Sequence, residues 1–211
     1  MKNLQKTILW ILVILPAIYL LIQWNSFGDE VPLHWNLKGE VDRYGSPKEL
    51  WIVGMIPFFI YFIFWLIPKI DPKNKILEMG KKYDQLKFLL VGMTSLLCLY
   101  LLYAIHKGRM VNTEMIFFFV GLVFIILGNY LPSIRPNYFV GIRTPWTLEN
   151  NDVWKDTHRL GGKLFVMLGL LTILLSLTIN IQQFFWIFFA LILISVGYLF
   201  YYSYAKFQDY Q

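Results

Sequence analysis

Two small groups of side chains in this sequence have residue types that could do chemistry. The first could bind a metal ion through an imidazole and carboxylates, and it comprises His34, Asp29, Glu30 and Asp42. The second places Thr144 and Thr147 ahead of His158, a combination of hydroxyl and base that nucleophilic catalysis requires. The first group has only one strong ligand type, and the second lacks a third residue to orient the base. We therefore predict no metal, no cofactor and no enzymatic activity.

Other signatures of catalysis are missing from the sequence as well. It contains no HExxH motif, no glycine-rich phosphate loop and no Cys/His cluster at metal-ligand spacing. Its one cysteine, Cys98, lies within an apolar block, so no intrachain disulfide can form. The missing motifs argue against an intramembrane protease. The single cysteine means that no disulfide can hold an outward-facing loop.

The elements that position these residues follow from the composition. Of 211 residues, 57% are hydrophobic and 15% are charged, and the mean hydropathy is +0.54. Soluble domains carry about 25% charged residues and interrupt their apolar residues at helix or strand period. Here the apolar residues form blocks of about 20, the length that crosses a hydrocarbon core of about 30 Å. The predicted spans are 7–24, 50–67, 86–105, 114–131, 163–179 and 184–204.

In lipid every backbone polar group must be bonded within the spanning structure, so we predict that each block is a helix. The fold class is then all-α, a polytopic transmembrane bundle of six helices. The first block follows Lys2 and Lys6 but lacks a signal-peptide cleavage site, and we expect it to remain as an anchor. The predicted segments are an N-terminal hairpin 1–67 with outer loop 25–49, a second hairpin 68–131, a cytoplasmic motif loop 132–162 and a C-terminal hairpin 163–211.

The distribution of Lys and Arg predicts the orientation. With both termini in the cytoplasm, 14 of the 19 basic residues lie inside, and Lys38, Arg43, Lys48, Lys107 and Arg109 lie outside. The basic loop 68–85 then faces the cytoplasm, where it acts as a topology signal, with repressor binding as the alternative. No segment carries more than +2 of the net charge of +6, and the outer loop is about −2, so we predict no direct contact with nucleic acid.

The spans themselves carry almost no polar chemistry. Their only charges, Lys87, Glu114 and Lys163, lie within two residues of a span end, which argues against a proton- or sodium-coupled transporter. A transporter or exporter component for a hydrophobic or peptide substrate stays open as an alternative. It would have to line its path with the few polar side chains available, which are Asn129, Thr94, Ser95, Thr172 and Ser176.

The outer loop ends in a clear helix start. Ser46 and Glu49 form a predicted capping box around Pro47 at the first helical position of the second span. Before it, Pro32 favours an extended path over residues 31–36, and Gly39 predicts a turn. The tripeptide His34-Trp35-Asn36 could contact a peptide; alternatively Trp35 lies in the interfacial aromatic belt and His34 is solvated.

The inner loop contains two helix starts. Thr144 is a predicted N-cap followed by proline at the first helical position, and Asn150 or Asn151 is a predicted cap for a second short helix. We expect this second helix to end at Leu160, closed by the two glycines that follow, and to lie flat at the membrane surface with Trp154 inserted.

Two stretches resemble a known family. Residues 140–148 read VGIRTPWTL, and together with Trp154 and the pair His158-Arg159 they resemble the signature of the SdpI family of bacterial immunity proteins. Residues 31–36, VPLHWN, with Gly39 and Asp42, are similar to a small domain of unknown function that often precedes it. The resemblance implies a multi-pass protein of the bacterial plasma membrane that protects a toxin producer from its own secreted, membrane-active peptide. It also implies signalling, because the family's namesake holds a DNA-binding autorepressor at the membrane.

The implied partners are the lipid bilayer, a secreted toxin peptide on the outer face and a cytoplasmic repressor protein. The predicted partner-binding residues of the inner motif are Gly141, Arg143, Thr144, Pro145, Trp146, Thr147, Trp154 and Arg159. The predicted toxin-facing residues are His34, Trp35, Asn36 and Asp42. Arg143 could pair with lipid phosphate, an acidic partner, Asp152 or Asp156, and His158 receives no role. The alternatives are a purely structural inner loop and a structural or sensor protein of the envelope.

Overall fold

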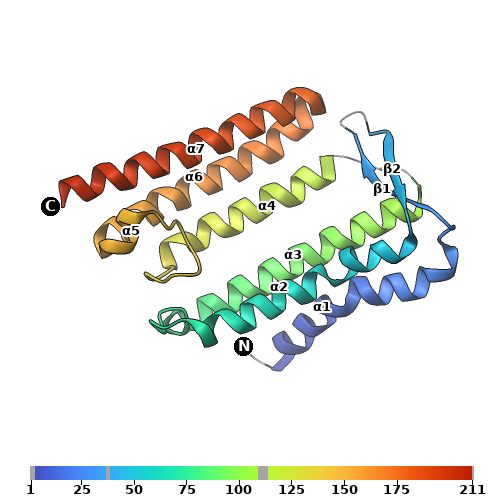
Figure 1. The fold of residues 1–211 in the computed structure, drawn as a ribbon, viewed down its shortest axis with the longest axis horizontal. Coiled ribbons are helices and arrows are strands. Elements are labelled where there is room, and N and C mark those ends of the chain that lie inside the picture. Colours follow the sequence, from blue (N-terminus) through green and yellow to red (C-terminus); the bar gives the residue numbers. More distant parts are fainter. Residues whose placement is uncertain (1–2, 37–38, 109–113, 211) are drawn as a thin grey trace. The chain divides into compact units, whose positions relative to one another are not determined.

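A computed structural model describes residues 3–36, 39–108 and 114–210, so Lys2, Lys38 and Arg109 of the charge count lie outside the described residues. The described chain contains six helices that are long and apolar enough to cross a membrane, which confirms the predicted fold class (Figure 1). They are α1 (Asn3–Gln23), α2 (Leu50–Ile70), α3 (Lys81–His106), α4 (Glu114–Tyr130), α6 (Asn151–Thr178) and α7 (Ile181–Asp209). The shorter elements are β1 (Val31–Trp35), β2 (Val41–Gly45) and α5 (Pro145–Glu149).

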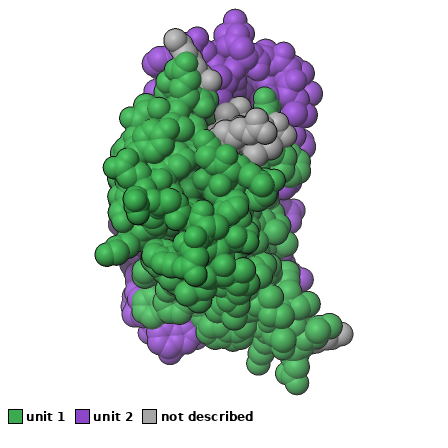
Figure 2. Space-filling model, turned by 90° about the vertical axis from the view of Figure 1, so that its right-hand side faces the viewer, with its two compact units in different colours: residues 1–64, 87–119 green, residues 65–86, 120–211 purple. Residues whose placement is uncertain are grey.

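The chain divides into two compact units (Figure 2). Unit 1 comprises residues 1–64 and 87–119, and it holds α1, the two strands and most of α2 and α3. Unit 2 comprises residues 65–86 and 120–211, and it holds α5, α6, α7 and part of α4. The predicted outer loop therefore belongs to unit 1, whereas the predicted inner motif belongs to unit 2.

In unit 1 the strands pack on the ends of three helices. Leu20 of α1, Leu50 of α2 and Leu102 of α3 are fully buried together with Val31 of β1. Farther along the same helices, Leu9 and Val13 of α1 pack against Val91 of α3. Burial of these side chains contributes about 25 cal/mol for each square ångström of apolar surface removed from water. The strands are thereby fixed to the helix ends.

The two strands form an antiparallel hairpin in which Val31 pairs with Gly45 and Trp35 with Val41. The extended path predicted for residues 31–36 is confirmed, but the second strand was not predicted, because Asp42 and Arg43 are poor strand formers. The predicted capping box is confirmed: Ser46 Oγ accepts a hydrogen bond from the Lys48 backbone, and the Ser46 backbone donates to Glu49 Oε1.

In unit 2, α4 and α6 approach through glycines. A Cβ added at Gly128 would lie 2.7 Å from the carbonyl oxygen of Gly162, and one added at Gly121 would lie 2.7 Å from that of Gly169. Backbones can come this close only where side chains are missing. The glycines of α4 therefore serve packing within the bundle. Phe124 of α4 adds edge-to-face contacts with Phe165 of α6 and Phe188 of α7.

One predicted boundary is wrong. The short helix through Leu160 and the span 163–179 are a single helix, α6, that runs through Gly161 and Gly162. Glycine ends a helix when it takes a positive φ, and these two do not. Gly162 instead lies against the backbone of Gly128 and the ring of Pro132, so its missing side chain serves packing.

Candidate functional site: the outer hairpin and the folded inner motif

The outer hairpin brings two of its predicted residues together. His34 Nδ1 of β1 lies 2.5 Å from Asp42 Oδ1 of β2, and both side chains are largely exposed. Asn36 Nδ2 donates to Glu40 Oε2 at 2.9 Å, which orders the turn. Trp35 is half-buried and packs on the apolar cluster of unit 1. Among the predicted toxin-facing residues, His34 and Asp42 are thus exposed, Asn36 is partly exposed, and Trp35 packs on the protein.

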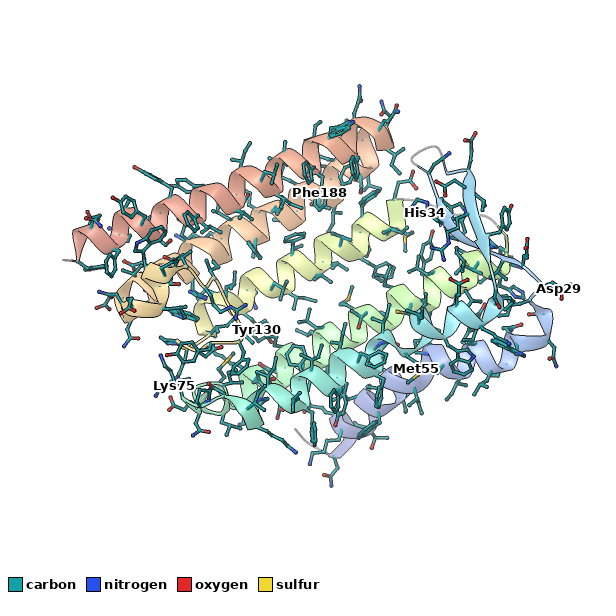
Figure 3. The ribbon with its side chains drawn as sticks, in the orientation of Figure 1. Asp29, His34, Met55, Lys75, Tyr130 and Phe188 are labelled. Atoms are coloured by element: carbon teal, nitrogen blue, oxygen red, sulfur yellow. The ribbon has the colours of Figure 1, made fainter. Side chains whose placement is uncertain are left out.

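The residues considered for a metal site do not converge. Asp29 lies on the segment before β1, away from His34 (Figure 3). Over residues 3–36, 39–108 and 114–210 no group of three or more His, Cys, Asp or Glu could hold a metal ion. The imidazole of His34 has a carboxylate as its partner instead.

The inner motif is built on a buried amide that the sequence did not single out. Asn137 is 1% exposed, and its Nδ2 donates to the carbonyls of Arg135 and Val140 at 2.7 and 3.0 Å. Its Oδ1 accepts from the backbone of Phe139 and of Val140, both at 2.7 Å. Asn favours such local turns, and the preceding Pro136 is the signal that could have identified it. This side chain fixes the path of the chain between α4 and α5.

Thr144 and Thr147 form a second buried network. The Thr144 backbone donates to Thr147 Oγ1 at 2.9 Å, and Thr147 Oγ1 donates to the carbonyl of Ile142 at 2.9 Å. Thr144 Oγ1 donates to Ser203 Oγ at 3.0 Å, which joins the motif to α7. The predicted N-cap is confirmed, with Thr147 in the position that Glu or Gln usually takes in a capping box. Both hydroxyls are therefore committed to structure.

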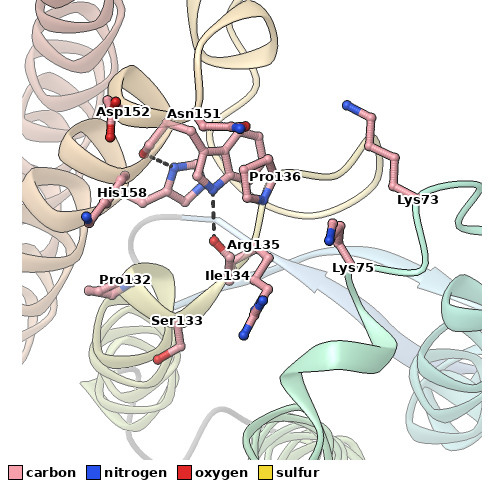
Figure 4. Close-up of a pocket in the computed structure, with 12 residues that line it drawn as sticks. Lys73, Lys75, Pro132, Ser133, Ile134, Arg135, Pro136, Asn151, Asp152 and His158 are labelled. Carbon is pink, nitrogen blue, oxygen red and sulfur yellow. Dashed lines mark hydrogen bonds between the residues drawn. The ribbon is translucent and has the colours of Figure 1, made fainter.

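The side chains of Trp154 and His158 form a surface against which the rest of the inner motif packs. Their rings are stacked, with centroids 4.1 Å apart and an interplanar angle of 18°. Trp154 Nε1 donates to the carbonyl of Ile134 at 2.8 Å (Figure 4). His158 Nε2 accepts from the backbone of Ile142 at 3.0 Å. Because Nε2 accepts, the proton is on Nδ1, which donates to the carbonyl of Trp154 at 2.8 Å. The imidazole is thus neutral, and both nitrogens have backbone partners.

The insertion of Trp154 into the membrane is a wrong prediction. The indole is 1% exposed and is buried inside the protein, where its N–H has a partner. The sequence placed Trp154 on an apolar helix face but gave no means of telling lipid from protein as its neighbour. His158, one turn farther along, is the residue that sequence reasoning missed. Its spacing of four from Trp154 was the signal, since such pairs meet on one face.

Position 141 requires glycine because its backbone passes close to the stacked rings of Trp154 and His158. Its φ is +117°, and a Cβ at this position would lie 3.1 Å from Trp154 and closer still to His158. A residue with a side chain would have to adopt an unfavourable backbone conformation and displace the stacked rings. Gly141 therefore acts in the motif as a structural residue.

The other predicted motif residues lie at the surface. Arg143, Pro145 and Arg159 are exposed, and the guanidinium of Arg143 donates to the carbonyl of Tyr138. Trp146 is half-buried, with its ring 4.9 Å from that of Phe200 on α7. Among the eight predicted partner-binding residues, Arg143 and Arg159 thus present exposed cationic groups to a partner, and Pro145 presents an exposed apolar group.

The known proteins that this chain resembles match both regions. Residues 133–203 match the SdpI/YfhL protein family, and residues 11–61 match a domain of unknown function, DUF1648. The chain is 26% identical over 175 residues to the immunity protein SdpI of Bacillus subtilis (strain 168). The matched region covers 82% of each of the two chains. No solved structure matches. With its six apolar helices, the chain is a multi-pass protein of the bacterial plasma membrane, and it is similar to the SdpI family.

Proposed function

We propose that this protein confers immunity to a secreted, membrane-active toxin peptide. The observation that carries the proposal is its similarity to the immunity protein SdpI over 82% of the chain. A match of that extent covers more of the chain than the inner motif alone, so it supports a shared function for the protein rather than a shared segment.

The geometry supports protection by binding rather than by reaction. Thr144 and Thr147 bond each other, and both nitrogens of His158 bond the backbone, so no hydroxyl faces an unoccupied base. Of the hydroxyls that a polar path would need, those of Thr94, Thr172 and Ser176 donate to carbonyls of their own helices. The hydroxyl of Ser95 is buried without a hydrogen-bond partner among the described residues. We accordingly assign no reaction to the protein and propose toxin contact at the hairpin residues His34, Asn36 and Asp42.

The test is survival of a bacterium that is killed by its own toxin peptide once its immunity gene is deleted. Expression of the full chain should raise the peptide concentration that kills half the cells. No change in that concentration, with the protein present in the membrane fraction, would count against immunity.

Paired variants locate the toxin-facing surface. Asp42→Asn removes the charge that faces His34 and should lower protection, whereas Glu149→Gln, an exposed carboxylate of α5, should leave it unchanged. Both proteins should accumulate to the same level, as measured by immunoblot of membranes. Equal protection by both variants would place toxin contact elsewhere on the protein.

A second function, recruitment of a cytoplasmic repressor, is favoured by the exposed cations of the inner motif. Arg143 and Arg159 project from a motif whose other predicted residues are largely buried or glycine. Arg143→Ala should abolish membrane recruitment of a fluorescent repressor while survival and abundance stay intact. Trp146→Ala should instead lower abundance, since its ring packs on Phe200. If Arg143→Ala leaves recruitment unchanged, the motif has a structural role only.

A further inference from the structure

A cavity of about 760 Å³ opens beside the stacked rings of Trp154 and His158 (Figure 4). It is formed entirely within unit 2 by three segments: the turn after α2, the segment that follows α4 and the first turns of α6. Part of its wall, formed by Ile134, Trp154 and His158, is held by the hydrogen bonds described above. The cavity is therefore a built feature of the motif, and neither toxin binding nor repressor binding accounts for it.

Positive charge dominates the lining. Four cations, Lys73, Lys75, Arg135 and Lys155, face a single lining carboxylate, Asp152. Outside the lining, Glu78 accepts from Lys75 at 2.8 Å and from Arg135 at 2.7 Å. Even with both carboxylates counted, four cations stand against two anions. The charge of the cavity is thus only partly compensated by the protein.

Two of the lysines are available to a ligand. Lys73 Nζ lies 4.4 Å from the ring centroid of Tyr138, a contact that leaves its N–H groups unsatisfied. Lys155 is exposed and forms no ion pair within the described chain. Ser133 adds a hydroxyl whose oxygen accepts from Lys82 Nζ at 2.9 Å, so its own hydrogen remains free to donate. Several donors around one cavity suit an oxyanion with several acceptor oxygens, of which phosphate is the best match.

The position along the chain indicates where that phosphate comes from. Lys73 follows the end of apolar α2 by three residues, and Arg135 follows the end of apolar α4 by five. Lys69, in the last turn of α2, lies 3.4 Å above the ring of Trp65, an arrangement typical of the membrane interface. We therefore expect the cations at the depth of lipid headgroups, where basic pockets between helices bind anionic lipids.

We propose that this cavity binds a phosphate group, supplied by the headgroup of an anionic phospholipid. The ammonium groups of Lys73 and Lys155 pair with the phosphate oxygens, Ser133 donates to one of them, and Arg135 remains bridged to Glu78. The proposal goes beyond immunity, and it holds whether or not the protein contacts a toxin.

The test measures binding to the purified full chain in an uncharged detergent by isothermal titration calorimetry. The probes are short-chain phosphatidylglycerol, short-chain phosphatidylcholine and glycerol 3-phosphate. The variant Lys73→Gln with Lys155→Gln should bind phosphatidylglycerol roughly 30-fold more weakly, since each lysine contributes a factor of about five near an anionic headgroup. The control Lys163→Gln changes an exposed lysine of α6 outside the cavity and should bind like the unchanged protein.

A second variant works in the opposite direction. Asp152→Asn removes the carboxylate from the lining and should tighten binding of phosphatidylglycerol, a result that a misfolded protein cannot give. If glycerol 3-phosphate binds as tightly as the lipid and with the same dependence on Lys73 and Lys155, the cavity takes phosphate from a soluble source. If the double variant binds like the unchanged protein, or if phosphatidylcholine binds equally well, the proposal is wrong.

Discussion

At the scale of single residues, the inner motif is a set of satisfied polar groups. Asn137, Thr144, Thr147, Trp154 and His158 are buried, and each has hydrogen-bond partners in the backbone or in one another. A buried polar group without a partner costs free energy, so the sequence of the motif is constrained far more strongly than a surface loop would be. The residue types that suggested nucleophilic chemistry are explained by this constraint.

Trp154→Phe tests one of these bonds. The change keeps the stacked ring but removes the indole N–H, which leaves the carbonyl of Ile134 buried without that donor. We expect a loss of about 1–3 kcal/mol in the free energy of unfolding and a lower melting temperature in detergent. Trp186→Phe, at a side chain that is 64% exposed, is the matched control and should change little. Equal melting temperatures for the two variants would contradict the assigned role of the bond.

Glu78 provides a test by pH. The hydrogen bond from Lys75, together with the charges of Lys75 and Arg135, holds the pKa of Glu78 below its ordinary value. A lowered carboxyl pKa stabilises the folded state above the ordinary pKa, and this stabilisation is lost as the pH falls through the folded pKa. Glu78→Gln should therefore lower the melting temperature slightly at pH 7 and not at all in strong acid; the effect is small because the ion pairs are exposed. A difference that persists unchanged into strong acid would show that the charge of Glu78 is not its cause.

At the scale of elements, the sequence predicted the helices well and their surroundings poorly. Length and hydropathy alone identify blocks that must be helical in lipid, and the capping residues Ser46, Thr144 and Asn150 mark helix starts by local chemistry. The continuity of α6 through Gly161 could not be read, since a glycine that ends a helix and a glycine that packs on another helix look alike in sequence. Trp154 was predicted to insert into lipid because the sequence does not show whether an apolar helix face packs against lipid or against protein.

The glycine contact between α4 and α6 makes an element-scale prediction. Gly128→Ala places a Cβ 2.7 Å from backbone atoms of α6, which cannot move aside as a side chain would. We expect a loss of about 1–3 kcal/mol in stability through forced separation of the helices. Gly197→Ala, in α7 with no atom within 4 Å of the added Cβ, should be neutral or stabilising by up to about 1 kcal/mol. Thermal unfolding in detergent, followed by intrinsic fluorescence, compares the two. A Gly128→Ala protein as stable as Gly197→Ala would contradict close backbone packing.

At the scale of the whole molecule, each family match falls within one of the two units. The DUF1648 match, residues 11–61, lies in unit 1, and the SdpI/YfhL match, residues 133–203, lies in unit 2. Sequence reasoning found both regions from short motifs, but it could not delimit the units, because α2, α3 and α4 each contribute residues to both. The units are interleaved along the chain, so a single cut cannot separate them.

The orientation of the whole chain across the membrane, with both termini in the cytoplasm, is also a prediction that can be tested. The native thiol of Cys98 is buried, and its replacement by serine gives a background for introduced cysteines. With both termini inside, Lys48→Cys should react with a membrane-impermeant maleimide in intact cells, and Lys155→Cys should react only after permeabilisation. Both positions are exposed, so reactivity reports the side of the membrane rather than burial. The reverse pattern would place the termini outside.

The unbroken course of α6 has a mechanical consequence. Its 28 residues make a rod of about 42 Å, longer than a hydrocarbon core of about 30 Å, so about 12 Å must project beyond the core or be taken up by tilt. Trp154 and His158 lie in the first turns of α6, and the close contacts with the glycines of α4 lie farther along the same helix. Because α6 is unbroken between its first turns and these contacts, any tilt of its first turns also moves the glycine contacts with α4.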